Sequence, residues 1–123
     1  MDLSRFRGRN RLFLIFASSD ENFGRQRALI QGHQAGFEDR DLLTLHLFED
    51  RPGTAAGETV TPEETVAARE DFGVEPGRFE VVLVGLDGTA KFRSREPVRA
   101  PDLFSRIDAM PMRRREMRGK NRS

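Results

Sequence analysis

The sequence predicts an α/β fold whose elements follow the order β-α-β-α-β-β-α. Two observations carry this prediction: short apolar runs recur along the chain, and helix-start or turn residues separate them. A third is an Asp-Gly turn between the last two predicted strands, which adds an antiparallel pair to a sheet that begins with parallel strands. We therefore expect a four-stranded mixed sheet with helices on both faces.

The first half of the chain predicts a parallel β-α-β unit. Residues 11–17, RLFLIFA, are apolar almost throughout, which is typical of a buried strand. The loop SSD at residues 18–20 supplies helix-capping side chains, and a helix is expected over residues 21–36. The next apolar run, LLTLHLF at residues 42–48, predicts a second strand, and a right-handed crossover would make it parallel to the first.

A polar segment and a well-marked helix come next. Residues 49–60 are rich in Gly, Thr and Ala, and we expect a flexible loop there. Thr61 is expected to cap the following helix, Pro62 suits its first position, and Glu64 completes a capping box. The helix should end at Phe72, because the next residue is a glycine suited to a left-handed cap.

A hairpin and a last helix complete the predicted fold. The apolar run FEVVLVG at residues 79–85 and the polar run AKFRSR at residues 90–95 predict two paired strands, the polar one at the edge of the sheet. A helix is expected over residues 101–110. The whole order is that of a minimal thioredoxin-like core, expected to occupy residues 1–112, and residues 113–123 are expected to be a flexible basic tail.

Composition excludes one large class of chemistry. The chain has no cysteine, so disulfide bonds, thiolate catalysis and Cys-ligated metals are all excluded. No apolar run approaches the roughly 18 residues that a membrane span requires, so we expect no membrane insertion. No leader follows Met1, which predicts a cytoplasmic protein, or a periplasmic or secreted one if a leader has been removed.

The net charge of +1 conceals a segregation of charge along the chain. Residues 1–11 carry four arginines against one aspartate, and residues 113–123 carry six basic residues against one glutamate. The remaining 11 basic and 18 acidic residues give the body a net charge of −7. Basic termini are compatible with nucleic acid or with an acidic partner, but the acidic body argues against nucleic acid.

Three segments resemble a known family. These are the motif F-x-x-R-D-L at residues 37–42, the run FEVVLVGLDGTAK at residues 79–91, and the run IDAMPMRRREM at residues 107–117. Together they resemble the DUDES family, a domain of unknown function found in short bacterial proteins and in animal extracellular proteins with sushi repeats. The resemblance extends from about residue 9 to residue 117. It implies a thioredoxin-like fold and brings no established activity.

Alignment with active thioredoxins shows what has been replaced. Asp20 and Phe23 fall where the two reactive cysteines would lie, and Glu80 falls where active members place a cis-proline. A thiol-disulfide or peroxide reaction requires a thiolate nucleophile. We therefore expect a thioredoxin-like domain without a redox centre, and no cofactor.

The region around these positions is the candidate binding cleft. A helix N-terminus with free N–H groups can bind a polar ligand, although simple helix capping accounts for the same residues. Gln26 lies on the apolar face of its predicted helix, where a buried amide with hydrogen-bond partners is the alternative. The candidate cleft comprises Ser18, Ser19, Asp20, Glu21, Gln26, Arg78 and Glu80.

A second candidate is a dense charged cluster before the second strand. Glu38, Asp39, Arg40 and Asp41 form either a surface recognition patch or an internal set of ion pairs that orients Arg40. The two histidines show no metal-ligand spacing, so no metal site is expected.

These observations favour a non-enzymatic module that binds an unknown protein or peptide through the cleft or a sheet edge. Two alternatives remain open. One is a cysteine-free enzyme that uses Asp20, Glu21 and His33 as acid–base groups. The other is a nucleic-acid accessory domain that uses the basic termini.

Overall fold

A six-stranded mixed sheet in the order β4-β3-β2-β1-β5-β6 organises the computed structural model, which describes residues 2–18 and 20–121. β1 runs parallel to β2, with Ile15 opposite His46, and antiparallel to β5, with Ile15 opposite Val81. The strands are β1 (Arg11–Ala17), β2 (Leu42–Phe48), β3 (Gly53–Ala55), β4 (Glu58–Val60), β5 (Glu80–Val84) and β6 (Ala90–Ser94). The helices are η1 (Ser4–Phe6), α1 (Asp20–Ile30), α2 (Gln34–Asp39), α3 (Pro62–Phe72), α4 (Ala100–Asp108) and α5 (Pro111–Asn121).

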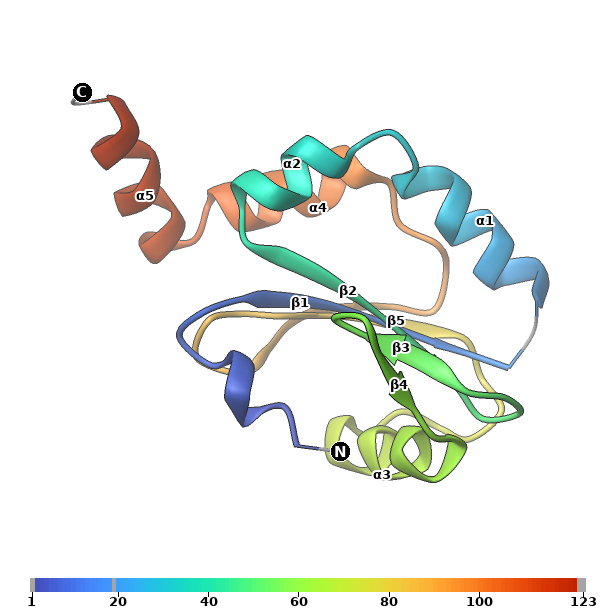
Figure 1. Cartoon of the computed structure of the whole chain (residues 1–123). Coiled ribbons are helices and arrows are strands. Elements are labelled where there is room, and N and C mark those ends of the chain that lie inside the picture. Colours follow the sequence, from blue (N-terminus) through green and yellow to red (C-terminus); the bar gives the residue numbers. More distant parts are fainter. Residues whose placement is uncertain (1, 19, 122–123) are drawn as a thin grey trace.

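Helices cover both faces of the sheet, as the sequence predicts. Figure 1 shows α1, α2 and α4 on one face, and α3 with the N-terminal segment on the other. Successive side chains of β1 point to opposite faces, so Phe13 and Ile15 enter one apolar core while Leu14 and Phe16 enter the other. All seven residues of β1 are buried, which explains the almost unbroken apolar run in its sequence.

The predicted capping box is present at the start of α3. The Thr61 hydroxyl accepts a 3.1 Å hydrogen bond from the Glu64 N–H, and the Glu64 carboxylate accepts a 3.1 Å bond from the Thr61 N–H. The helix ends at Gly73, whose φ of +67° is the left-handed cap expected of glycine.

The sheet has six strands rather than the predicted four, because the segment 49–60 folds into the hairpin β3–β4. β3 pairs antiparallel with β2, with Ala55 opposite Leu45. Gly53 permits this pairing, since a Cβ there would lie only 1.9 Å from the carbonyl oxygen of His46. Each strand has three residues, too few to show an alternating apolar pattern.

The single helix predicted over residues 21–36 is two helices in the structure. α1 ends at Ile30, and α2 begins at Gln34 after Gly32, whose φ is +85°. A left-handed glycine ends an α-helix, so the chain changes direction between the two.

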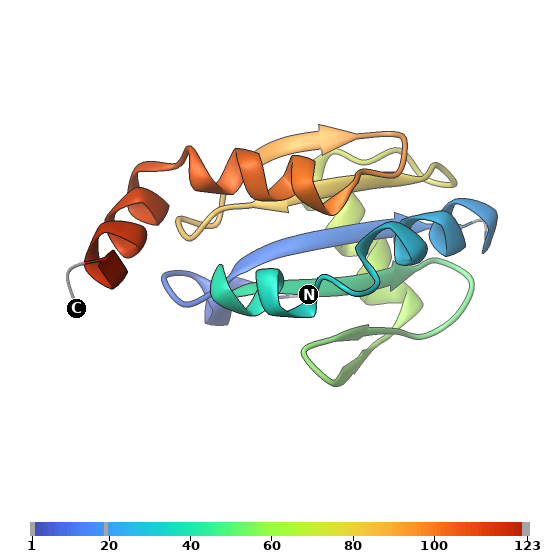
Figure 2. The same ribbon diagram turned by 90° about the horizontal axis from the view of Figure 1, so that it is seen from above.

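The segment expected to be a flexible tail is instead largely helical. Residues 111–121 form α5, and Arg113 has only 2% of its surface exposed. Both views show α5 extending beyond the end of α4, away from the sheet (Figures 1 and 2). Side-chain pairing of Arg113 with residues distant in sequence accounts for this difference. No helix in residues 2–18 and 20–121 combines the length and apolar content of a membrane span.

Candidate functional site

The predicted cleft lies where β1 ends and α1 begins. The Ser18 hydroxyl donates a 2.8 Å hydrogen bond to the carbonyl oxygen of Gly77, which joins this loop to the segment before β5. Glu21 is exposed on the first turn of α1. Ser19 and the side chain of Asp20 lie outside the described residues. The hydroxyl of Ser18 therefore connects two loops through this hydrogen bond.

Gln26 is a buried structural residue. Its side-chain NH₂ donates to the carbonyl oxygen of Val98 at 2.9 Å, and its side-chain oxygen accepts from the Val98 N–H at 2.7 Å. With none of its surface exposed, the amide pairs both backbone groups of one residue in the connection to α4. These bonds agree with the alternative given for Gln26, a buried amide with hydrogen-bond partners, and the side chain holds the connection to α4 in place.

Glu80 and Arg78 lie at the start of β5 and just before it, on the same side as Ser18. Glu80 is 7% exposed, with its carboxylate 3.2 Å from Arg93 Nη1 and 3.8 Å from Arg95 Nε. Arg78 is exposed and pairs at 2.8 Å with Glu75. A shallow hollow of about 350 Å³ is lined by Gly73, Glu80, Arg93, Ser94 and Arg95.

Arg69 holds this end of the molecule together, and sequence reasoning missed it. It is 1% exposed, and its Nη1 donates to the carbonyl oxygens of Glu75 and Arg78 at 2.6 Å and 2.8 Å. Its Nε lies 2.5 Å from Glu49 Oε1. Burial lowers the pKa of Arg69, and the Glu49 carboxylate opposes that shift. A lone arginine on a polar helix gives no sequence signal of such a role.

The charged cluster of residues 38–41 is divided by the structure. Arg40 pairs with Asp108 through Nε at 3.1 Å and Nη2 at 2.9 Å, while Asp39 pairs with Arg113 at 2.6 Å. Glu38 instead accepts a 3.3 Å bond from Gln34 on its own helix. Asp41, with φ +49°, turns the chain into β2, and its carbonyl oxygen accepts from the Arg11 N–H.

Of the acid–base groups considered for an enzyme, Glu21 and His33 do not converge, and the side chain of Asp20 lies outside the described residues. Glu21 lies in the first turn of α1, and His33 lies beyond the last turn of that helix, about 15 Å away along its axis. The ring of His33 packs against Phe104, with the ring centroids 6.1 Å apart. Within the described residues, no group of three or more His, Asp or Glu side chains is arranged to hold a metal.

His46 lines a hollow of about 670 Å³ between α1 and β2. Burial, with a smaller contribution from nearby Arg27, lowers the pKa of His46 and favours the neutral imidazole. The ring packs edge-on against Phe23, with the centroids 5.1 Å apart. Among the described residues, none of those that line this hollow is a carboxylate, so the lining offers His46 no acid with which to form an acid–base pair.

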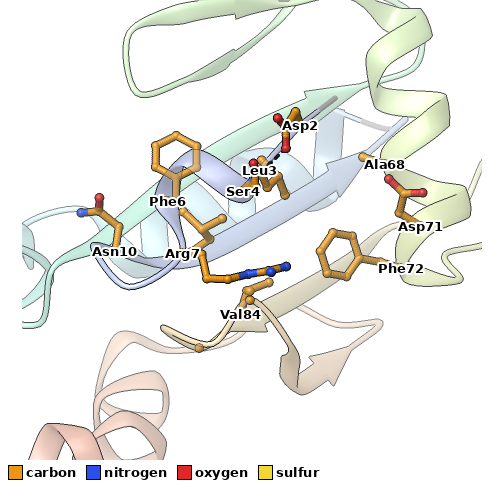
Figure 3. Close-up of a pocket in the computed structure, with 13 residues that line it drawn as sticks. Asp2, Leu3, Ser4, Phe6, Arg7, Asn10, Ala68, Asp71, Phe72 and Val84 are labelled. Atoms are coloured by element: carbon orange, nitrogen blue, oxygen red, sulfur yellow. Dashed lines mark hydrogen bonds between the residues drawn. The ribbon is translucent and has the colours of Figure 1, made fainter.

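A further hollow of about 310 Å³ lies on the opposite face of the sheet, under the N-terminal segment. Figure 3 shows the Arg7 side chain stretched across it toward Phe72 and Val84, with Asp71 above. A Cβ at Gly88 would lie 2.7 Å from Arg7 Nε, so the arginine side chain passes directly over this glycine. The Asp2 carboxylate accepts a 2.9 Å hydrogen bond from the Ser4 N–H, and hydrogen bonding with Ser4 lowers the pKa of Asp2. The chain's own N-terminal segment therefore occupies much of this region.

Comparisons with known proteins agree with this architecture. The model of the family described as a domain of unknown function (DUF4174) matches residues 2–116. A coiled-coil domain-containing protein 80 from Danio rerio is 32% identical over 133 residues, covering 94% of this chain and 15% of the relative. The sushi repeat-containing protein SRPX2 of Xenopus laevis is 26% identical over 120 residues, covering 94% of this chain and 26% of that relative. The chain thus spans about a quarter or less of these relatives.

Solved structures confirm the thioredoxin-like fold. The reduced 2-Cys peroxiredoxin of Plasmodium vivax superposes with a TM-score of 0.64 at 16% identity, covering 94% of this chain and 85% of that protein. The mitochondrial 2-Cys peroxiredoxin of Plasmodium falciparum gives 0.62 at 16% identity, covering 89% and 80%. Because the present chain has no cysteine, it shares their fold without their thiol chemistry.

Proposed function

The chain belongs to the DUF4174 family of domains of unknown function, and from this premise we propose that it is a non-enzymatic module that binds an extended acidic segment of a partner protein. The binding surface is the outer edge of β6 together with Lys91, Arg93 and Arg95, which we name the β6 edge. The resemblance to the DUDES family, with its bacterial and animal members, stays a prediction.

One observation carries the proposal: β6 is the terminal strand of the sheet, and its outer backbone groups lack a strand partner among the described residues. An extended peptide can add to such an edge through main-chain hydrogen bonds, while its side chains supply specificity. Figure 2 shows this strand, in light orange, at the border of the sheet with α4 lying over one face. The other end strand, β4, has only three residues and offers a shorter template.

The charge of the β6 edge selects the chemistry of the segment. Lys91, Arg93 and Arg95 are all exposed, and within the described residues they pair with the carboxylates of Asp87, Glu75 and Glu80. The ion pairs of Arg95 are long, at 3.7 and 3.8 Å. The pair between Arg95 and Glu75 is exposed on both sides and contributes little to stability, so Arg95 can turn toward a carboxylate of a partner. Charges on an edge strand also prevent uncontrolled pairing with other sheets.

The internal bonding of the predicted cleft supports binding rather than catalysis. Ser18, Gln26 and Glu80 each make hydrogen bonds or ion pairs within the chain, and they do so in different places. An acid and a base that act together in catalysis must both lie within hydrogen-bond reach of the reacting atoms of the substrate. The predicted cleft contributes to the proposed surface through Glu80, which positions Arg93 and Arg95 at the end of β6.

Fluorescence anisotropy tests the proposal with a labelled peptide of alternating Glu and Val residues. We expect saturable binding that weakens as salt is added, because exposed charges are screened. The double variant Arg93→Gln/Arg95→Gln should bind about tenfold more weakly, since two exposed charge contacts are worth roughly 1.4 kcal/mol together. The matched control Arg114→Gln/Arg115→Gln, on the exposed face of α5, should bind as the parent chain does.

Two further peptides distinguish strand addition from simple charge attraction. A peptide of the same sequence with alternate backbone nitrogens methylated cannot form the main-chain ladder, so its binding should be lost. A peptide of alternating Lys and Val should also fail to bind. Equal affinity for the methylated and unmethylated peptides, or an equal loss of affinity in both double variants, would refute binding along the β6 edge.

A further inference from the structure

A second surface lies where α4 meets α5, on the side of the β5–β6 turn. It is a hollow of about 650 Å³, within the range of roughly 300–1,000 Å³ typical of small-molecule sites. We name it the methionine hollow. It is lined by Arg11, Leu83, Gly85, Leu86, Asp87, Lys91, Arg106, Ala109, Met110, Pro111 and Met112.

The apolar part of the methionine hollow is contributed by the turn and by the connection between the helices. Leu83 is fully buried and Leu86 is partly exposed. Met110 is partly buried against the core, while Met112 has 47% of its surface exposed. Val66, at 46%, is the one other large apolar residue of comparable exposure in the described part of the chain. Methionine side chains adapt to the shape of an apolar ligand.

The polar part of the hollow is predominantly cationic. The lining contains the cations Arg11, Lys91 and Arg106 and a single carboxylate, that of Asp87. Asp87 already accepts hydrogen bonds from Lys91 at 2.8 Å and from the Thr89 N–H and hydroxyl at 3.0 and 2.8 Å. These bonds, with that from Lys91 the largest contribution, lower the pKa of Asp87 well below its usual range. Arg106 is exposed, with its guanidinium carbon 3.8 Å from the centre of the Phe92 ring.

Arg11 supplies the observation that points to a ligand. It is 1% exposed, and its two terminal nitrogens donate to the Arg40 carbonyl oxygen at 2.9 Å and to Glu116 at 2.8 Å. Its Nε is buried, yet it has no hydrogen-bond partner within the described residues. A buried N–H without an acceptor is unfavourable. Arg11 is one of the lining residues, so an anionic oxygen that enters beside its guanidinium and displaces the side chains covering Nε would provide the missing acceptor.

We propose that the methionine hollow binds a small amphiphile with one carboxylate head and an unbranched apolar tail. The head group lies toward Arg11 and Arg106, and the tail packs on Leu86, Met110 and Met112. The excess of cations over carboxylates in the lining selects an anion, and the apolar remainder selects the tail. This site shares Lys91 with the β6 edge but none of its other lining residues, and it does not depend on the function proposed for that edge.

Isothermal titration calorimetry with dodecanoate, kept below its micelle concentration, tests the proposal. We expect saturable binding of one molecule per chain, and no binding of dodecyltrimethylammonium. Arg106→Gln should weaken binding about tenfold, as expected for the loss of one charge-assisted contact of roughly 1.4 kcal/mol. Arg115→Gln, which removes an exposed charge on α5 outside the hollow, should leave the affinity unchanged.

A second pair of variants tests the apolar wall. Met112→Glu places a carboxylate where the tail should lie and should abolish binding, whereas Val66→Glu, a change of similar exposure on α3, should not. Both positions are on the surface, so unfolding should not confound the comparison. Co-sedimentation with anionic phosphatidylglycerol vesicles tests whether the hollow binds a membrane surface instead of a free amphiphile. We expect the protein not to sediment with the vesicles. Absence of saturable dodecanoate binding, equal losses within either pair of variants, binding of the cationic amphiphile, or sedimentation with vesicles would overturn the proposal.

Discussion

Replacing Arg113 by alanine should destabilise the fold far more than its place in a basic C-terminal run suggests. Arg113 lies on α5 with 2% of its surface exposed. Its Nη2 lies 2.6 Å from Asp39 of α2, its Nε lies 3.0 Å from Asp108 of α4, and its Nη1 lies 3.4 Å from Glu116. One guanidinium thus connects three helices, and its removal leaves their carboxylates close together.

The size of the effect follows from the burial of each partner. Removing one member of a fully buried ion pair costs about 3–5 kcal/mol, because an uncompensated charge stays behind. Here the side chains of Asp39, Asp108 and Glu116 are 44%, 33% and 30% exposed, so solvent can screen them. We therefore expect a loss of about 2–3 kcal/mol in the free energy of unfolding, discounted from that upper range. For a domain of this size that is a fall of about 10 °C in Tm.

Urea unfolding, followed by circular dichroism at pH 7, measures this loss. The control is Arg114→Ala, which removes an exposed arginine from the next position and should change stability by less than about 0.5 kcal/mol. A loss in Arg113→Ala no larger than in this control would refute the proposed role of the network.

The difference between the parent chain and Arg113→Ala should also depend on pH. Burial alone would raise the pKa of Asp108, but hydrogen bonds from Arg40 and Arg113 outweigh it and lower that pKa. Glu116 behaves in the same way through Arg11 and Arg113. A carboxyl group whose pKa is lowered by folding stabilises the fold above its unfolded pKa and loses that contribution as pH falls through the folded one. The difference in the free energy of unfolding between the two proteins should therefore be largest near pH 7 and become smaller below about pH 4.

Three other predictions follow from the same structure. Gln26→Leu should cost about 2–4 kcal/mol in urea unfolding, because both backbone groups of Val98 lose their partner, whereas Leu at the exposed Gln31 should have little effect. Deleting the chain from Arg113 onward should cost more than about 2 kcal/mol, since Arg11 also loses Glu116; a loss typical of a surface change would contradict the packing of α5. The purified, metal-stripped chain should neither reduce insulin disulfides nor consume peroxide, and measurable turnover would refute the exclusion of thiol chemistry.

Elements with a local physical cause could be predicted from the sequence. β1 and β2 have the predicted bounds because their apolar runs are buried in the centre of the sheet. α3 begins at Pro62 because the preceding Thr61 and the following Glu64 satisfy its first backbone groups locally. The hairpin β3–β4 could not be predicted in this way. Its strands are too short to show a pattern, and it forms by pairing with β2.

Long-range pairing explains the other differences. Nothing near Arg113 in the sequence indicates that Asp39, which is 74 positions away, will bind it. Arg69 likewise becomes buried only because the segment before β5 folds over it and presents two carbonyl oxygens. Gln26 could be predicted to be buried, since its position on the apolar face of α1 is a local property. The identity of its partner, Val98, depends on the tertiary fold.

Buried arginines occupy both ends of the sheet, and this arrangement restricts where binding can occur. Arg69 fixes the segment before β5 at one end, and Arg11 and Arg113 fix α5 at the other. Polar groups that are already paired within the fold contribute little free energy to the binding of a partner, because each new contact must replace an existing one. Binding is therefore expected where polar groups are incompletely paired. The outer backbone of β6 and the buried Nε of Arg11 meet that condition within the described residues. Lys91 borders both surfaces, but Arg93 and Arg95 lie outside the methionine hollow, so Arg93→Gln/Arg95→Gln should weaken peptide binding and leave amphiphile binding intact.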